Sequence, residues 1–179
     1  MSNSGKVDGD LSRIHGYGDY HPNLVRVEEG HWDSGFLAVG INPEIKLDGW
    51  SSLNGTDYRV VYRRGIKGCE VNLPKYVNAS KLDIVSSVNS GFSKVLRNWS
   101  DIYVGADMNI VNALKSETFE KAELNIIGVM DKFSAHLYLH KKNRILAPKI
   151  TKRLKSMKKD GTIAKFRKQA GLKSYFDKQ

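Results

Sequence analysis

The stretch LDIVSSVNSGFSKVLRNWSDIYVGAD at residues 82–107 decides the expected fold, because it alternates the sequence patterns of strands and helices. Residues 82–85 and 101–104 are short apolar runs of strand length. Between them, Ser90 is placed to cap a helix that carries an apolar stripe at i, i+3, i+4 and i+7. The stripe consists of Phe92, Val95, Leu96 and Trp99. Short strands joined by helices of about ten residues pair in parallel through crossovers, so the stretch predicts an open α/β sheet.

The same alternation continues on both sides of this stretch. The turn over residues 65–68 is bracketed by glycines and is placed to open a helix, which Pro74 disfavours beyond the preceding residue. A further helix is expected to follow Asp107. Additional strands are expected over residues 58–62, 124–129 and 135–139. All of these elements extend the predicted α/β sheet.

The N-terminal segment has a different character. The first 48 residues are rich in Gly, His and Asp and contain no convincing helix. Strand-like runs occur at residues 10–14, 24–27 and 36–41. The segment is too poorly patterned to form a core alone, so we expect it to pack against the C-terminal helices.

The C-terminal stretch, residues 141–179, is amphipathic and strongly basic. It holds 14 of the 29 Lys and Arg residues against two acidic residues, in a chain whose formal net charge is +10. Ile163 and Phe166 are expected to turn inward from a short second helix that follows the main one. The apolar face of the main helix consists of Leu146, Ile150, Leu154 and Met157. This pattern favours a solvated basic face on an ordinary amphipathic helix.

A nucleic-acid- or polyanion-binding protein that uses this basic helix stays open as the alternative. A nucleic-acid binder usually spreads its positive charge over a whole face, whereas the first 140 residues here hold 15 Lys and Arg against 17 Asp and Glu. The aromatic residues that a single-strand binder interleaves with its cations are missing between residues 141 and 165. We therefore rank this alternative second.

Length and composition exclude several other classes. The 179 residues are 40% hydrophobic and 27% charged, which is typical of one globular domain or two small lobes. No apolar run reaches the roughly 18 residues that a membrane-spanning helix needs. The first eight residues lack the apolar region of a signal peptide. The lone Cys69 excludes an internal disulfide and is expected to be a buried thiol.

Four segments in order carry a resemblance to a known family. They are SGKVDG at residues 4–9, WSSLNG at 50–55 continuing into YRVVYRRG at 58–65, GFSKVLRNWSDIYV at 91–104, and the closing pair YLHKKN at 138–143 and LKSMKKDGTIAK at 154–165. Over most of its length the chain thereby resembles the bacterial extracellular solute-binding proteins of the amino-acid type. Their fold is the type II periplasmic-binding-protein fold.

This resemblance implies a non-catalytic protein of the amino-acid ABC-transporter type, with two small α/β lobes joined by a hinge. Residues 1–45 and 130–179 would form the first lobe, and residues 46–129 the second. A small polar ligand such as an amino acid would lie between the lobes, and a membrane permease or sensor would recognise the closed state. The resemblance implies a periplasmic location, or a cytoplasmic one if a chain without a signal peptide is complete.

The chain departs from the family at its start. Family members begin with a strand, a ligand-lining loop and a helix that precede the segment at residues 4–9, and these elements are absent here. We therefore expect an incomplete first lobe and weakened ligand binding. Sheet edges left exposed in that lobe would favour a homo-oligomer.

Binding of an amino acid requires donors for its carboxylate, an anion for its ammonium group and an apolar wall. Asp107 resembles in position the acidic residue that holds the ammonium group in the family. The helix starts near residues 65–67 and 87–90 offer N–H donors, and Arg13 is the best carboxylate partner in the first lobe. The candidate ligand-binding residues are Arg13, Gly65, Ile66, Lys67, Ser87, Ser90 and Asp107. A plain turn, a helix N-cap or a surface arginine remains open as the simpler role of each.

The sequence contains no motif that indicates catalysis, metal binding or cofactor binding. His136 and His140 are four residues apart, but along a strand this spacing separates them by more than about 13 Å. No phosphate-binding loop, nucleophile elbow or dinucleotide fingerprint occurs. We expect no cofactor and no metal, and an enzyme on the same fold ranks lowest because no residue is a better catalytic candidate than Asp107.

Overall fold

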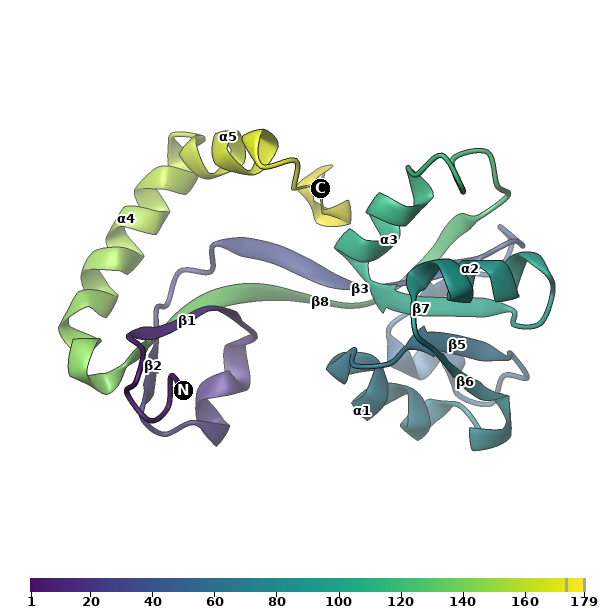
Figure 1. Ribbon diagram of the computed structural model, residues 1–179, viewed down its shortest axis with the longest axis horizontal. Coiled ribbons are helices and arrows are strands. Elements are labelled where there is room, and N and C mark those ends of the chain that lie inside the picture. The colour runs from purple at the N-terminus through teal and green to yellow at the C-terminus, as the bar shows by residue number, and fades with distance from the viewer. Residues whose placement is uncertain (173, 179) are drawn as a thin grey trace. The chain divides into compact units, whose positions relative to one another are not determined.

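Two compact units make up the computed structural model, which describes residues 1–172 and 174–178 (Figure 1). Unit 1 combines Met1–Ser34 with Phe133–Lys173, and unit 2 combines Gly35–Lys132 with Ser174–Lys178. Two long strands pass from one unit into the other, β3 (Trp32–Gly40) and β8 (Asn125–His140). Among the described residues, no helix is long and apolar enough to cross a membrane.

Unit 2 is built on three parallel strands, β5 (Val60–Arg63), β6 (Leu82–Val85) and β7 (Ile102–Ala106). β5 lies in the middle of the three, and β3 pairs antiparallel with β7 on the outer side. A two-residue strand, β4 (Leu47–Asp48), pairs in parallel with β8. Each of the three parallel strands leads directly into a helix: α1 (Lys67–Tyr76), α2 (Val88–Leu96) and α3 (Asp107–Leu114). The α/β class predicted from the sequence is confirmed.

The core of unit 2 follows from the alternation of side chains along its strands. Val60, Tyr62 and Val104 point to one face and pack with Leu73 of α1. Residues between them in sequence point to the opposite face and pack beneath α2 and α3. That second cluster is formed by Leu37, Val39, Val61, Val85, Phe92, Val95, Tyr103, Ile110, Phe119 and Phe176. Both faces of the sheet are therefore covered by apolar packing.

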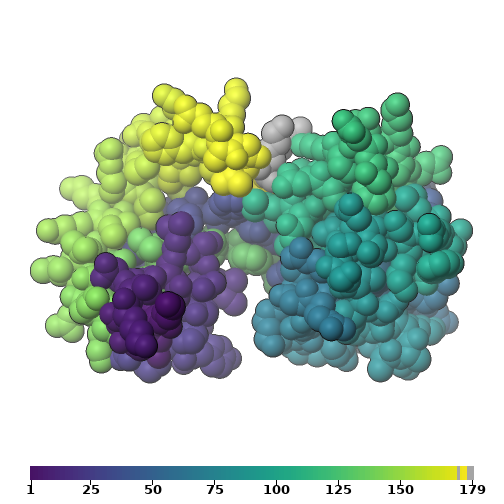
Figure 2. Space-filling model, viewed as in Figure 1, coloured from purple at the N-terminus to yellow at the C-terminus, as the bar shows by residue number. Residues whose placement is uncertain are grey.

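Unit 1 is organised around the second half of β8. Two strands pair antiparallel with it, β1 (Gly9–Arg13) and β2 (Leu24–Arg26). The 3₁₀ helix Lys141–Leu146 follows β8 and leads into α4 (Ala147–Lys159) and α5 (Thr162–Gln169). Figure 2 shows the N-terminal residues and this C-terminal stretch lying side by side within the unit, where Lys158 pairs with Glu29 at 2.6 Å. Its cluster of buried apolar residues comprises Val27, Leu139 and Ala147.

Several local predictions are wrong in ways that packing explains. The strands expected at 124–129 and 135–139 are one continuous strand, which includes the exposed polar residues Asp131 and Lys132 where β8 leaves one unit for the other. Helix α1 runs past Pro74 to Tyr76, since Leu73 and Val77 are buried on either side of the proline. Phe166 does not turn inward but is 55% exposed beside an open apolar groove of unit 1.

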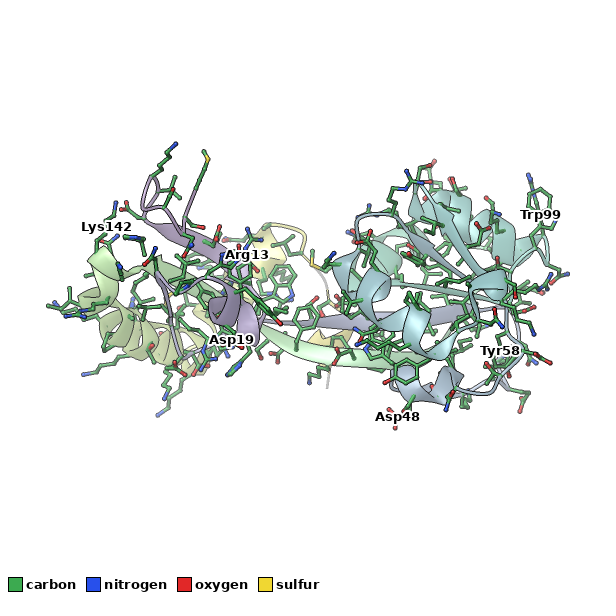
Figure 3. All side chains as sticks on the ribbon, turned by 90° about the horizontal axis from the view of Figure 1, so that it is seen from below. Arg13, Asp19, Asp48, Tyr58, Trp99 and Lys142 are labelled. Carbon is green, nitrogen blue, oxygen red and sulfur yellow. The ribbon has the colours of Figure 1, made fainter. Side chains whose placement is uncertain are left out.

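The helix predicted from Ser90 to Trp99 begins and ends earlier than expected, at Val88 and Leu96. Its N-cap is Ser87, whose Oγ accepts the backbone N–H of Ser90 at 3.0 Å. Asn98 adopts a left-handed conformation with φ of 56°, which ends the helix at Leu96. Trp99 therefore falls outside the apolar stripe and is 59% exposed. Figure 3 labels its side chain at the margin of unit 2.

The boundaries between the units lie elsewhere than the sequence suggested. Residues 35–45 and 130–132, assigned to the first lobe, belong to unit 2. The reason is that Leu37 and Val39 of β3 are completely buried in the same cluster as Phe92. The C-terminal residues 174–178 join unit 2 as well, through the buried Phe176.

Candidate ligand-binding site

The carboxyl ends of β5, β6 and β7 meet at one edge of the parallel sheet in unit 2. The turn over residues 64–66 joins β5 to α1, Ser87 caps α2, and Asp107 is the first residue of α3. Six of the seven candidate residues thus lie along this edge, the common location of ligands in parallel α/β sheets. They are Gly65, Ile66, Lys67, Ser87, Ser90 and Asp107.

The turn before α1 presents a backbone donor and a cation. Gly65 has a φ of 83°, a conformation that favours glycine, and its N–H points into the first turn of the helix. That N–H donates to Oε1 of Glu70 at 2.8 Å, and the Lys67 ammonium lies 3.8 Å from the other carboxylate oxygen. The Lys67 side chain is 85% exposed. The carboxylate of Glu70 therefore already interacts with the backbone donor and the cation of this turn.

Asp107 is completely buried at the start of α3. Its Oδ1 accepts the backbone N–H of Gly35 at 3.4 Å. Its Oδ2 accepts the hydroxyl of Ser174 and the backbone N–H of Tyr175, the latter at 3.3 Å. A carboxylate in the first turn also interacts favourably with the helix dipole. The geometry gives Asp107 several donors from distant parts of the chain, which a plain N-cap would not need.

An aromatic side chain packs against the start of α1. Phe36 of β3 is the register partner of Ala106, next to Asp107. A Cβ built on Gly68, one residue after Lys67, would come within 2.2 Å of the Phe36 ring. The ring also lies 5.4 Å from that of Trp50, centroid to centroid. Phe36 therefore supplies a half-buried apolar wall at the same edge of the sheet.

The two serines at the start of α2 are engaged with one another. Ser87 Oγ lies 2.8 Å from Ser90 Oγ and accepts the Ser90 N–H. Ser90 is exposed and Ser87 is half-buried. Their geometry is that of a helix cap, which is the simpler of the two roles considered for them.

Arg13 belongs to unit 1, apart from the other six candidates. Its guanidinium pairs with Asp10 at 3.2 Å and lies 4.9 Å above the ring of Tyr17. Figure 3 labels its side chain next to β1. Within unit 1 it is a partly exposed arginine that already has a carboxylate partner.

The histidines fill structural positions in unit 1. Nδ1 of His136 lies 2.9 Å from the carbonyl oxygen of Val27, and the ring stacks edge-on against that of His15. Burial, followed by the nearby charges of His136 and Lys158, lowers the pKa of His31. Within the described part of the chain, no group of three or more His, Cys, Asp or Glu residues is placed to hold a metal ion.

Unit 1 also carries a basic groove of about 580 Å³ between β2 and the start of α4. Arg26 pairs there with Glu28 at 2.7 Å. The four cations that line the groove are Arg26, Arg144, Lys152 and Lys155. This groove is the surface on which binding of a polyanion would depend.

Residues from outside the motifs complete the site in unit 2. Glu70, Phe36 and the pair Ser174 and Tyr175 were not among the candidates. Glu70 carries a recognisable signal, because an acidic residue in the first turn after a glycine turn is placed to accept its N–H groups. The other three reach the edge of the sheet only through the fold.

Comparisons with known proteins agree with this architecture. No family model matches the chain. An uncharacterized protein of Shewanella oneidensis is 33% identical over 170 residues, which cover 95% of this chain and 64% of that protein. The chain therefore spans less than two thirds of the length of this relative.

Three of the solved structures that match this fold are an ArgBP variant, an arginine-binding protein and an L-cystine receptor. A variant of ArgBP from T. maritima matches with a TM-score of 0.62 at 16% identity, covering 94% of this chain and 70% of that one. An ancestral arginine-binding protein bound to arginine gives 0.63 at 19% identity, covering 94% and 73%. The L-cystine solute receptor of Neisseria gonorrhoeae, in its unliganded open conformation, gives 0.66 at 16% identity, covering 94% and 69%.

The fold of the chain is thus the periplasmic-binding-protein-like α/β fold, as the sequence predicted. At these identities the likeness establishes the fold alone. Any ligand or transport role has to be argued from the site itself.

Proposed function

We propose that this chain is a non-catalytic solute-binding protein of the amino-acid type, and that unit 2 supplies its ligand-binding residues. The observation that carries the proposal is the buried carboxylate of Asp107 at the same sheet edge as the Gly65 turn. A negative group and a cluster of positive groups on adjacent parallel strands match the two charges of an amino acid. The shared fold of several amino-acid receptors supports this interpretation.

Each residue has a definite role in the proposal. Asp107 accepts hydrogen bonds from the ligand ammonium group. Lys67 and the backbone of the adjoining turn face the ligand carboxylate, because the first turn of a helix attracts anions. Phe36 packs against the aliphatic part of the ligand.

The partners of the chain follow from the same proposal. A receptor of this type would present its ligand to a membrane permease or a sensor in the periplasm. Such receptors work by binding more tightly to one conformation and shifting the population toward it. We propose that this chain binds with low affinity, since Arg13 is the one candidate ligand-binding residue in unit 1.

The proposal is tested by thermal shift with each of the twenty amino acids at millimolar concentration. A ligand that binds the folded state raises the melting temperature, with a stabilisation that grows as the logarithm of its concentration. We expect a shift with at least one amino acid, and its loss in Asp107→Asn. Asp57→Asn is the matched control, because the Asp57 side chain is 98% exposed in the same unit. Absence of any shift in the whole panel, including the C-terminal variants described below, would contradict the proposal.

The basic groove of unit 1 supports a second candidate function, the binding of a polyanion. Four cations and a single acidic residue line it. Retention on heparin with a steep salt dependence, reduced in Lys152→Glu, would support this function. Elution below physiological salt would exclude it. Lys75→Glu, which changes an exposed lysine of unit 2, is the control.

A further inference from the structure

The C-terminal residues Ser174, Tyr175 and Phe176 are built into unit 2 at the proposed ligand site. Ser174 is 6% exposed and Phe176 is 5% exposed. The Phe176 ring packs so closely on Gly35 that a Cβ built there would lie 2.6 Å from it. The ammonium of Lys132 lies 5.3 Å from the centroid of the same ring. The absence of a side chain at residue 35 therefore creates the space that Phe176 fills.

The polar groups of this segment point at Asp107. The Ser174 hydroxyl and the Tyr175 N–H both donate to Oδ2, and the same hydroxyl accepts the N–H of Phe176 at 3.1 Å. Hydrogen-bond donors directed at a carboxylate are what a ligand ammonium group would offer. The segment thus occupies the acceptor that the proposed function assigns to the ligand.

The other half of the site is occupied in a similar way. Glu70 presents its carboxylate to the N–H of Gly65 and faces the Lys67 ammonium. Both charged groups of an amino acid therefore have an internal counterpart in this structure. The internal counterparts differ in kind, because Glu70 belongs to α1 itself, whereas Ser174 and Tyr175 lie in a terminal segment.

We propose that the segment from Ser174 to Phe176 is an internal ligand that competes with the amino acid for Asp107. This inference rests on the proposed function, because Asp107 must be the ammonium acceptor. A binding-competent state that is only partly populated lowers the apparent affinity by the fraction populated. Displacing the segment costs its hydrogen bonds to a buried carboxylate and the burial of the Phe176 ring. Weakening the segment should therefore tighten ligand binding.

The test is calorimetric titration of the full chain with L-arginine, L-glutamine and L-cystine, using the one that gives the largest thermal shift. Ser174→Ala and Phe176→Ala should each raise the affinity by about 10-fold or more. The first variant removes a hydrogen bond to the Asp107 carboxylate from the competing state, and the second removes the burial of the Phe176 ring. Ser156→Ala, on the exposed face of α4, should leave the affinity unchanged. The N-acetyl derivative of the same amino acid lacks the ammonium group, so neither variant should raise its affinity.

A second measurement follows the segment itself in the unaltered chain. The Tyr175 amide should be protected from hydrogen exchange in the free protein and lose that protection when ligand is added. Unchanged affinity in both variants, or unchanged Tyr175 protection on binding, would overturn the inference while leaving the proposed function intact. If neither the chain nor its variants bind any amino acid, both proposals fail together.

Discussion

The two units differ strongly in the number of apolar residues buried in their interiors. In unit 2, two clusters of 12 and 10 buried hydrophobic residues cover the two faces of the sheet. In unit 1, the corresponding cluster has three members. Most of the large hydrophobic side chains that are exposed in the described chain belong to unit 1: Met1, Val7, Leu11, Ile14, Tyr20, Ile145, Leu146 and Phe166. The comparison teaches that stability is concentrated in the unit that carries the proposed site.

Charge sharpens the same contrast. Unit 1 contains 16 Lys and Arg residues against 7 Asp and Glu, whereas unit 2 contains 13 against 12. Like charges repel one another in a compact state. Unit 1 therefore combines a small interior with electrostatic repulsion, and unit 2 has neither disadvantage.

The largest expected effect comes from removing a buried ring of unit 2. Phe92 is completely buried and contacts the rings of Tyr103 and Phe119 edge to face. Phe92→Ala should reduce the free energy of unfolding by about 3–5 kcal/mol, measured by urea denaturation. Leu154→Ala in unit 1 is the comparison, because Leu154 is only partly buried in the small cluster. Equal losses in the two variants would contradict the contrast between the units.

A smaller effect is expected at the start of α2. Ser87 accepts the N–H of Ser90, so Ser87→Ala leaves a helix-terminal donor without its partner and should cost about 1 kcal/mol. Ser90→Ala removes a hydroxyl that caps no helix and should cost less. Urea denaturation of both variants decides which serine is the cap. A larger loss in Ser90→Ala would contradict the assignment.

Acidification should give the smallest change in stability, and the two units should lose stability at different pH values. Burial lowers the pKa of His31 in unit 1 from 6.5, so the stability it contributes is present above that pH and is lost as the pH falls below it. In unit 2, the hydrogen bond from Arg59 lowers the pKa of Asp101 from 3.8, so that stability is lost only below this value. Amide NMR spectra recorded along an acid titration should show unit 1 resonances losing dispersion first.

His31→Gln provides the control for this titration. The variant has no group that titrates at residue 31, so the onset for unit 1 should move to lower pH while that of unit 2 stays in place. Loss of both units over the same pH interval would contradict the assignment of the acid response to separate groups.

Local sequence patterns were sufficient to predict the architecture of unit 2. Strong periodicity marks the apolar runs at 82–85 and 101–104 and the helix between them. The connection between the two strands is short. Parallel strands then bring Gly65, Ser87 and Asp107 to one edge without any further information. The grouping of these residues is therefore a consequence of topology.

The remaining features depend on contacts between residues distant in sequence. Ser174 lies 67 positions from Asp107, and no periodicity in the sequence links the two. Phe36 reaches the site because β3 continues from unit 1 into unit 2, which the predicted lobe boundary at residue 45 excluded. The continuity of β8 was missed for the same reason, since its exposed middle has the polarity of a loop.

Cys69 gives this contrast a chemical reporter. Its thiol is completely buried on the inner face of α1, with Sγ 3.8 Å from the carbonyl oxygen of Val104, and burial raises its pKa to about 12. A thiol in that state is shielded from alkylating reagents, which attack the thiolate. Because the sequence contains one cysteine, the rate of alkylation counts the openings of unit 2 alone. The alkylation rate of Cys69 thus reports the opening of the better-packed unit 2, and fluctuations of unit 1 do not change it.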